Sequence, residues 1–545
     1  MDQKEILLNK FYLKRKVFYE FTLEEVMFKN LTFNENEKKY IQIARYIREL
    51  INRGVLIEGS KLPSSREISS ILSIGRNTVM SAYEILESEG FVETIKGKGT
   101  FVKKEFSNEK STKVSSIKKE NSEIREDKWN IDWKYKTNEY GVLAESLDII
   151  KSEEKWEKGM ISFKSIAPPG NLFNIEELKR SFSNRIALEK HKIVNYGYAV
   201  GYKPFIDYLK DYMKEKGAYS EEKEIIVTNG FTEGLDMMLS AFTKDGNYIL
   251  CENPTHNTAL KIMKTHKLNI IGVKMTKDGM DIEDLNKKIE KLGEKIKFAY
   301  LIPSYHNPTG VVASIKKREE VYNILKDAGI PIIEDGFNEE LLYESSPTIP
   351  LASLDRESNG VIYIGSFSKI LFPGLRIGWV YGDKKIIGIL ESVKRCRNIH
   401  TSFLDQGILY DFMISGAFEK YIKKVRKVYK EKYKFTKRVI EKYIKDAEIW
   451  GEGGLYMFLK IKGVDTRELL KRCYDRGVLF MPGDLFYIDN DLYLEKENRV
   501  FSLEGHNIKD REKRDTLRIG FTRLSEEEIE KGIKIIGEEV KSILT

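Results

Sequence analysis

The chain has 545 residues, with 92 Lys and Arg against 84 Asp and Glu, and therefore a net charge of +8. At about 150 residues per domain, this length excludes a single small domain. The 41% hydrophobic and 32% charged residues are typical of a globular protein and exclude a wholly disordered one. The small positive charge permits nucleic acid as a partner without requiring it.

The cysteines and the N-terminus predict a reducing, cytoplasmic location. Cys251, Cys396 and Cys473 are too far apart for a disulfide framework or a zinc ribbon, so no disulfide and no metal site is expected. The chain starts with charged residues such as Asp2 and Lys4, and it contains no run of about 18 apolar residues. Neither a secretory signal nor contact with a membrane is therefore expected.

A charged segment divides the chain into two domains. Residues 103–128 hold eight Lys and Arg, six Asp and Glu and few large apolar residues, so they cannot offset the entropy cost of ordering. We expect a linker over 103–155, an N-terminal domain over 36–102 and a large domain over 156–545. Residues 1–35 form an N-terminal extension to which the sequence assigns no role.

The N-terminal domain has the pattern of a helix-turn-helix. From Tyr40 to Asn52 the apolar residues recur at three- and four-residue spacing, which predicts an amphipathic helix. Ser64 or Ser65 can cap a short helix that ends at Leu72. A tight turn then leads to a second helix over Arg76–Ser88. Two helices joined by so short a turn indicate a helix-turn-helix.

The start of the second helix suits contact with DNA. A helix that enters the major groove presents its first residues to the base edges. Arg76, Asn77 and Thr78 stand at that start, and their side chains suit base and phosphate contacts. Arg66, on the preceding helix, is placed to add a further contact.

A basic hairpin, or wing, follows the second helix. Residues 91–95 predict one strand and residues 101–102 its partner. The turn between them holds Lys98 and Gly99, and such a basic tip can lie along a phosphate backbone. An alternative is a small packing module with a solvated face, because Lys and Arg exceed Asp and Glu only by ten to seven between Tyr40 and Lys104.

The winged helix-turn-helix of GntR-type transcriptional regulators resembles the whole segment LPSSREISSILSIGRNTVMSAYEILESEGFVETIKGKGTFV. The resemblance implies a double-stranded DNA operator as a partner. It assigns DNA contacts to Arg66, Arg76, Thr78 and Gly99. Gly75 departs from the family, where a serine is common, although glycine can still cap the helix.

The large domain has the pattern of a parallel sheet. Residues 298–302, 330–333 and 361–364 predict buried strands, with a helical pattern between the first two. Ligands bind outside the carboxyl ends of parallel strands. Three polar residues follow these strands and are expected at one edge: Asn307, Asp335 and Lys369.

A fourth predicted strand, over residues 224–227, leads into an anion site. Gly230, Phe231 and Thr232 come next, at the start of a predicted helix over residues 233–242. The backbone N–H groups at a helix N-terminus bind anions such as phosphate. The loop after another strand supplies further donors: Ser366, Ser368 and Arg376.

These groups together suit pyridoxal 5′-phosphate (PLP), whose aldehyde condenses with an amine such as that of Lys369. Asp335 would hold the ring nitrogen protonated, and Asn307 would donate to the phenolate oxygen. His256 would stack on the ring face. Arg518 would bind a substrate carboxylate through two hydrogen bonds. Taken singly, residues of these types more often have ordinary structural roles: they form part of a turn, are solvated, or form an ion pair at the surface.

Four motifs resemble those of class I and II aminotransferases of PLP fold type I: SFSKILFPGLRIGW, HNPTG, IIEDGF and TLRIGF. The similarity runs from about Ile161 to the C-terminus. Together with the N-terminal domain it resembles the MocR/GabR family of regulators. That resemblance implies an α/β fold with a mainly parallel sheet, a homodimer, and an effector that is an amino-acid-like compound or PLP itself.

Three features depart from the aminotransferase pattern. Phe337 replaces a common tyrosine two residues after Asp335, which removes a hydroxyl near the cofactor and disfavours efficient transamination. His256 stands where a tyrosine is commoner. A polar insertion over Glu495–Arg514 precedes Arg518 and can reshape the substrate entrance.

Two main hypotheses follow. The first is a PLP-dependent transcriptional regulator in which an effector that reacts at Lys369 changes the geometry of the dimer. The second is a working aminotransferase with an appended DNA-binding domain. A third is a DNA-binding protein that has lost its cofactor.

Overall fold

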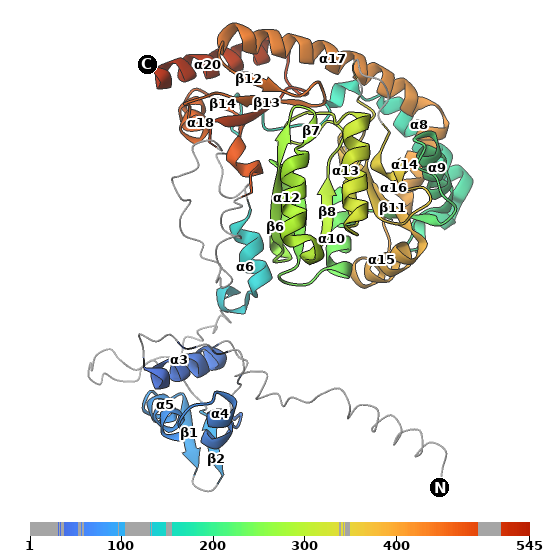
Figure 1. The fold of residues 1–545 in the computed structure, drawn as a ribbon. Helices are drawn as coiled ribbons and strands as arrows, with labels where there is room; N and C mark the ends of the chain where they lie inside the picture. The colour runs from blue at the N-terminus through green and yellow to red at the C-terminus, as the bar shows by residue number, and fades with distance from the viewer. Residues whose placement is uncertain are drawn as a thin grey trace, which may run out of the picture. The chain divides into compact units, whose positions relative to one another are not determined.

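The computed structural model describes residues 38–52, 59–95, 98–103, 133–148, 155–336, 349–488 and 514–545, with a few short stretches between them. The chain forms two compact units, Met1–Thr137 and Asn138–Thr545 (Figure 1). The boundary between the units falls inside the segment predicted as a linker.

The small unit has the elements predicted for a winged helix-turn-helix. They are α3 (Lys39–Asn52), α4 (Ser65–Ile71), α5 (Arg76–Ser88), β1 (Val92–Ile95) and β2 (Gly99–Val102). The strands pair antiparallel, with Val92 opposite Val102 and Ile95 opposite Gly99.

Capping and burial explain why the small unit folds this way. Ser64 and Glu67 form a capping box, in which each side chain accepts a hydrogen bond from the other residue's backbone N–H, so α4 starts at Ser65. Ile47, Ile68 and Val79, one from each helix, are fully buried in a shared core.

The large unit begins with a helix inside the predicted linker. Helix α6 (Glu139–Ser146) is capped by the Asn138 side chain. It lies against α11 (Asn257–Thr265), where Lys261 Nζ lies 3.6 Å from Asp148 Oδ1. Lys267, just after α11, pairs with Glu139.

An eight-stranded sheet forms the centre of the large unit in the described part of the chain, in the order β4-β11-β10-β9-β8-β5-β6-β7. Its strands are β4 (Lys223–Thr228), β5 (Tyr248–Asn253), β6 (Asn269–Thr276), β7 (Gly279–Met280), β8 (Ile296–Leu301), β9 (Ile332–Asp335), β10 (Val361–Ser366) and β11 (Gly378–Asp383). Strand β11 runs antiparallel to both β10 and β4, and β7 runs antiparallel to β6. The other six strands therefore share one direction, and the predicted mainly parallel sheet is confirmed.

The predicted strand over residues 330–333 starts two residues later in the structure. The N–H of Ile330 donates to the carbonyl of Leu325 in the turn after α13 (Ile315–Asp327), and Pro331 has no N–H to give to the sheet. As a consequence, Asp335 is the last residue of β9 rather than part of the following loop.

Helices cover both faces of the sheet (Figure 1). Along β10, Val361 and Tyr363 belong to one buried core, and Ile362 and Ile364 to another. Three helices cover the second core: α10 (Phe231–Phe242), α11 and α15 (Lys384–Arg397). The first core is covered by α9 (Lys203–Glu215), α12 (Ile282–Leu292), α13, α14 (Leu351–Leu354), α16 (Phe403–Ile414) and part of α17 (Ala417–Tyr443). Burial on both faces explains the nearly continuous apolar strands.

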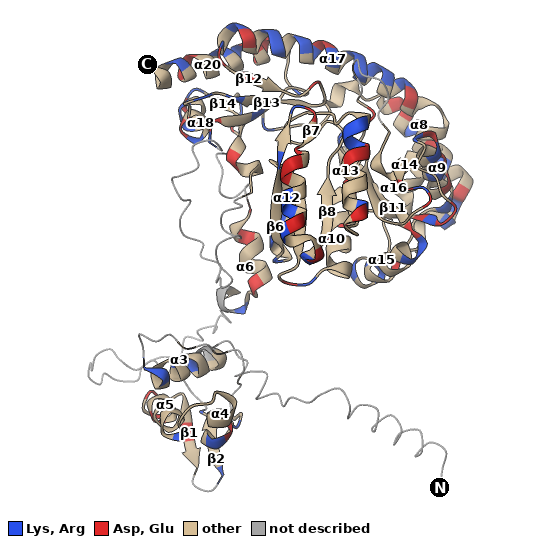
Figure 2. Cartoon of the chain, viewed as in Figure 1, with Lys and Arg blue, Asp and Glu red and all other residues tan. Residues whose placement is uncertain are grey.

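The C-terminal part adds an antiparallel sheet in the order β12-β13-β16-β15. Its strands are β12 (Glu448–Trp450), β13 (Tyr456–Lys460), β15 (Met481–Pro482) and β16 (Thr516–Gly520); β14 (Val478–Leu479) pairs with β3 (Ile161–Ser162). Among the described residues, the other α-helices of this unit are α8 (Ile175–Glu189), α18 (Thr466–Asp475) and α20 (Glu526–Leu544). Figure 2 shows the many Lys and Arg residues along α17. Among the described residues, no helix has both the length and the apolar composition needed to cross a bilayer.

Candidate functional site

The shared strand direction brings the predicted site residues to one edge of the sheet. Gly230 follows β4, Asn307 follows β8, Asp335 ends β9 and Lys369 follows β10. Because these four strands run the same way, their carboxyl ends meet at that edge. Arg518 comes from the C-terminal sheet and donates to Asn307 there.

A buried carboxyl and a neutral imidazole lie together at this edge. The Tyr300 hydroxyl donates to Asp335 Oδ2 at 2.7 Å, and His256 Nδ1 lies 3.9 Å from the same oxygen. Burial raises the pKa of Asp335 to about 7, although the Tyr300 hydrogen bond opposes that rise. Burial, followed by the charges of Arg518 and Lys369, lowers the pKa of His256 to about 3. A buried acid beside an uncharged flat ring fits the cationic nitrogen and the face of a pyridinium ring.

The His256 ring also has an aromatic neighbour. Its centroid lies 5.6 Å from that of Phe231, with the two rings tilted by 40°. Sequence reasoning used only the backbone N–H of Phe231. In the structure, the Phe231 side chain also has a role, because it packs against the His256 ring that was predicted to stack on the cofactor.

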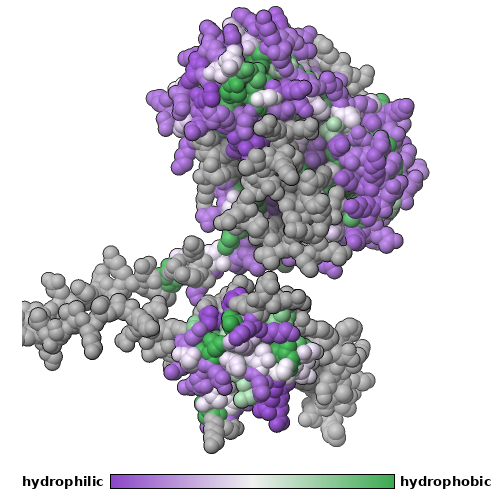
Figure 3. All heavy atoms as spheres, turned by 60° about the vertical axis from the view of Figure 1, so that its left-hand side comes forward, coloured by the Kyte–Doolittle hydropathy of each residue, from purple (hydrophilic) through white to green (hydrophobic). Residues whose placement is uncertain are grey.

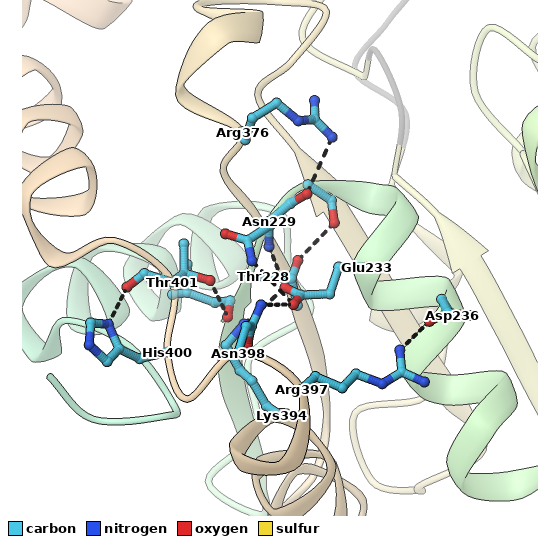
Figure 4. Close-up of polar contacts among 12 residues, drawn as sticks. Thr228, Asn229, Glu233, Asp236, Arg376, Lys394, Arg397, Asn398, His400 and Thr401 are labelled. Carbon is cyan, nitrogen blue, oxygen red and sulfur yellow. Dashed lines mark hydrogen bonds and ion pairs between the residues drawn. The ribbon is translucent and has the colours of Figure 1, made fainter. Parts of the chain in front are cut away.

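The loop before α10 and the loop after β10 form an anion cradle. Arg376 Nη1 donates to Ser368 Oγ at 3.1 Å. Its Nη2 donates to the carbonyl oxygen of Asn229 at 3.2 Å, as Figure 4 shows. The N–H of Ser368 donates to Ser366 Oγ at 3.3 Å. Gly230 has a φ of +82°, and a Cβ there would lie 2.7 Å from Arg376 Nη2. Only glycine therefore lets the guanidinium lie against the helix N-terminus.

A cleft of about 460 Å³ adjoins this cradle. Thr232 and Arg376 lie in its wall, together with Glu233, Asp236 and Arg397. The cradle residues are therefore reachable by a small anionic ligand, as the phosphate of a cofactor requires.

The amine of Lys369 is electrostatically activated. Burial, followed by the positive charges of Arg518 and Arg376, lowers the pKa of this amine to about 8. Arg523, which the sequence reasoning missed, lowers the pKa in the same direction. A lysine amine is nucleophilic only when neutral, so this environment favours its reaction with an aldehyde.

This pKa predicts the pH dependence of PLP capture by the protein stripped of cofactor. An ordinary lysine titrates near 10.5, whereas half of the Lys369 amine is neutral near pH 8. We expect the capture rate to rise about tenfold from pH 6 to 7, about fivefold from pH 7 to 8, and to level off above pH 9. Stopped-flow absorbance measures this rate, with Nα-acetyl-lysine as the control amine. A rate that keeps rising as steeply up to pH 10 would contradict the prediction.

Arg518 is held for recognition of a carboxylate. Its guanidinium lies 5.2 Å from the ring centroid of Tyr456 and 5.0 Å from that of Phe486. Nη1 donates to Asn307 Oδ1 at 2.9 Å and Nη2 to the carbonyl oxygen of Lys164 at 3.4 Å, while the buried Nε has no hydrogen-bond partner among the described residues. Burial lowers the pKa of Arg518 to about 10, so the group stays charged at neutral pH.

The contact with Arg518 also orients Asn307. Since the amide oxygen Oδ1 accepts from the guanidinium, the amide nitrogen is the part left to donate, as the predicted hydrogen bond to a phenolate oxygen requires. Sequence reasoning treated these two residues separately. The structure joins them across 211 residues of chain.

Several residues of the site escaped the sequence reasoning. Tyr300 looked like one more apolar residue of a strand, and nothing local indicated that its hydroxyl meets Asp335. Asn229 directly precedes Gly230, so its position next to the predicted anion site could have identified it from the sequence. Phe337 and nearly all of the insertion over Glu495–Arg514 lie outside the described residues.

In the small unit, the predicted DNA contacts are largely on the surface. Arg66, Arg76, Asn77 and Lys98 are exposed and Thr78 is half-buried. Figure 2 marks Lys and Arg residues on α3 and α4 of this unit.

Two of the predicted contacts also have structural partners. Arg76 Nε donates to Ser65 Oγ at 3.1 Å, which tethers the start of α5 to α4. Gly99 has a φ of +124°, and a Cβ there would lie 2.7 Å from Lys61 Cε. The positive φ, which side chains rarely adopt, therefore accounts for a glycine at this position, and its contact with DNA stays a prediction.

Two protein families match the two units. The family described as "Aminotransferase class I and II" matches residues 160–536, and "Bacterial regulatory proteins, gntR family" matches residues 39–102. The gntR match covers the helices and strands of the small unit, and the aminotransferase match covers most of the large unit.

Known proteins resemble both the whole chain and the large unit alone. An HTH-type transcriptional regulator of Bacillus subtilis (strain 168), YdfD, is 26% identical over 87% of this chain and 96% of its own length. Aromatic-amino-acid aminotransferase 1 of Thermococcus litoralis is 30% identical over 65% of this chain and 82% of its own. The α-aminoadipate aminotransferase LysN of Thermus thermophilus, solved with N-(5′-phosphopyridoxyl)-L-leucine, superposes with a TM-score of 0.65 at 25% identity. That match covers 76% of this chain and 99% of LysN.

Proposed function

The chain belongs to the class I and II aminotransferase family and joins that domain to a gntR-family DNA-binding domain, and on this premise we propose that its effector is an amino acid that reacts at Lys369. The protein itself is a PLP-dependent, DNA-binding transcriptional regulator, as predicted. The alternative of a working aminotransferase with an appended domain is not favoured, because regulators match over nearly their whole length.

PLP is the cofactor, and the described residues fit it. When bound, it supplies an aldehyde that exchanges between primary amines. We assign its phosphate to the cradle of Gly230, Phe231 and Thr232, with Arg376, Ser366 and Ser368 as side-chain donors. Asp335 holds the proton of the ring nitrogen, His256 covers the ring face and Asn307 donates to the phenolate oxygen.

The observation that carries the effector class is the position of Arg518 beside Lys369. The charge of Arg518 is the largest single-residue influence on the Lys369 amine, after burial. The same arginine has its buried Nε unpartnered among the described residues. A ligand that satisfies both groups needs a primary amine for the aldehyde and a carboxylate for the guanidinium. Amino acids carry these two groups close together.

A second copy of the chain is the proposed partner of the large unit. Helix α8 and the segment after it expose large apolar side chains, among them Leu188 at 69%, Tyr196 at 85% and Tyr198 at 74%. The Tyr196 ring lies 6.1 Å from that of His400, which places the half-exposed Ile399 beside this surface. On the face drawn in Figure 3, hydrophilic residues cover most of the described surface of the large unit, apart from an apolar patch near its top. An apolar patch like the one on and after α8 marks an interface, and sedimentation equilibrium measures the resulting dimer directly.

The experiment that tests the proposed function measures binding to DNA. Operator sequences selected from a random pool are titrated with the protein stripped of cofactor, with PLP, and with PLP plus single amino acids. We expect at least one amino acid to change the dissociation constant by about fivefold or more, since a regulatory ligand must bind two conformations differently. Identical affinity in every condition would contradict the proposal, and sustained production of keto acid would favour the aminotransferase.

The variant Arg518→Gln tests the carboxylate contact in the same assay. It should weaken the response to the active amino acid by about tenfold to a hundredfold, the range for a lost hydrogen bond to a charged group. The matching amine without a carboxylate serves as control, because it would replace the Lys369 amine at the aldehyde without using Arg518. If Arg518→Gln weakened the response to both compounds equally, Arg518 would not be the residue that recognises the carboxylate.

A further inference from the structure

A largely buried ion pair adjoins the anion cradle. Lys394 Nζ, on α15, lies 2.9 Å from Glu233 Oε2, on the first turn of α10. The Lys394 side chain is fully buried and that of Glu233 is 12% exposed. The side-chain amide of Asn398 also donates to Glu233 (Figure 4). None of the predicted site residues takes part in this pair.

Glu233 fixes the residue that starts the cradle. Its Oε2 accepts the backbone N–H of Asn229, and its Oε1 accepts the side-chain amide of Asn229 at 3.2 Å. The carbonyl oxygen of Asn229 in turn accepts from Arg376. One carboxylate thus holds the backbone from which the Gly230, Phe231 and Thr232 N–H groups follow, and indirectly the arginine across from them.

The negative charge of Glu233 would repel a bound phosphate, and the positive charge of Lys394 balances it. A carboxylate in the first turn suits the helix dipole, but it has the same sign as a phosphate bound at that helix N-terminus. Lys394 is a fully buried cation in contact with that carboxylate. The pair is therefore neutral as a whole, and Glu233 can position the loop without repelling the phosphate.

We propose that Glu233 and Lys394 are a positioning pair that pre-forms the anion cradle and so makes this protein prefer PLP over pyridoxal, its form without phosphate. The proposal rests on the proposed function, because it takes the cradle to be the phosphate site. Neither residue touches the cofactor. Glu233 acts through Asn229, and Lys394 acts through Glu233.

The chain contains a matched control pair. Lys223 Nζ lies 2.8 Å from Asp355 Oδ2, and both side chains are at most 2% exposed. Lys223 begins β4 and Thr228 ends it, so this pair lies about 17 Å from the cradle along the same strand. Breaking it should cost stability as breaking the first pair does, without changing the charge beside the phosphate.

The experiment compares dissociation constants for PLP and for pyridoxal, measured by absorbance on the full chain stripped of cofactor. Lys394→Met leaves the Glu233 charge unbalanced, and we expect PLP to bind about tenfold to a hundredfold more weakly. Lys394→Met combined with Glu233→Gln removes both charges and keeps an acceptor for the Asn229 N–H, so PLP affinity should return to within about threefold of the wild type. Lys394→Met with Glu233→Ala lacks the acceptor and should stay weak. Pyridoxal affinity should change by less than about twofold throughout.

Thermal unfolding of each variant separates loss of fold from loss of cofactor binding. Lys223→Met should lower the unfolding temperature but keep the wild-type ratio of the two constants. The inference would be overturned if Lys394→Met weakened the binding of PLP and of pyridoxal equally. It would also be overturned if the double variant with Glu233→Gln bound PLP no more tightly than Lys394→Met alone. In both cases the proposed function would stand. Failure of the wild type to bind PLP would overturn both.

Discussion

Replacing Lys369 by alanine is expected to abolish covalent capture of PLP. Lys369 is the lysine that follows β10 at the edge where Asp335 and Asn307 also lie, and its depressed pKa of about 8 makes it far more nucleophilic than a surface lysine. Purified wild type should carry the visible absorbance of a lysine-bound cofactor, and the alanine variant should be colourless even after incubation with PLP. Without the covalent bond and its effector chemistry, DNA binding should no longer respond to amino acids.

Two controls make this result specific. Lys384→Ala removes a half-exposed lysine at the start of α15 and should leave the spectrum unchanged. Borohydride reduction followed by peptide mapping should place the label on Lys369 in the wild type. Colour that persists in the Lys369 variant, or a label on another lysine, would contradict the assignment of the reactive amine.

Replacing Arg76 by alanine is expected to weaken operator binding while leaving the cofactor spectrum intact. Arg76 is the first residue of α5 and is exposed, with its Nε held by Ser65. A good contact between an arginine and a base is worth about 1–3 kcal/mol, which corresponds to a loss of about five- to a hundredfold in affinity. Fluorescence anisotropy with the selected operator, at several salt concentrations, measures this loss.

The salt dependence tells how Arg76 acts. If it contacts only a phosphate, the slope of log affinity against log salt should fall by about one and all DNA sequences should be affected alike. A base contact should instead reduce the preference for the operator. Arg45→Ala, which removes another exposed arginine of the same unit, on α3, is the matched control. Unchanged operator affinity for Arg76→Ala would contradict a recognition role for α5. Loss of the cofactor spectrum would contradict the expectation that the large unit binds PLP without help from α5.

The most accurate predictions concern features written in short stretches of sequence. Helix α5 begins and ends at the predicted residues, and Ser64 caps α4 as one of the two predicted serines. These features depend on residues within a few positions of each other, so a single sequence contains what is needed. The predicted start of β9 was two residues too early, because Ile330 is apolar and buried like a strand residue although its N–H belongs to the turn after α13.

The roles of single site residues were harder to foresee. His256 and Asp335 are 79 residues apart, and only the assembled sheet places them within 3.9 Å. Gly99 was assigned a DNA contact on resemblance alone, and that contact stays a prediction; its φ of +124° is what favours glycine there. The stretch Glu233 to Phe242 was read only as a helix, and nothing near Glu233 in the chain indicates a partner at Lys394.

The sequence by itself determined that this protein has a gntR-type unit and an aminotransferase-like unit, and which lysine, aspartate and asparagine follow successive strands. Those are properties of local patterns, since capping, hydrophobic periodicity and motif spacing act over a few residues. Only the tertiary structure decided that Arg518 orients Asn307, that Tyr300 donates to Asp335 and that Lys394 neutralises Glu233. Such contacts join residues that are distant in the chain, and they form because the strand order and the helices packed on the sheet bring those side chains together.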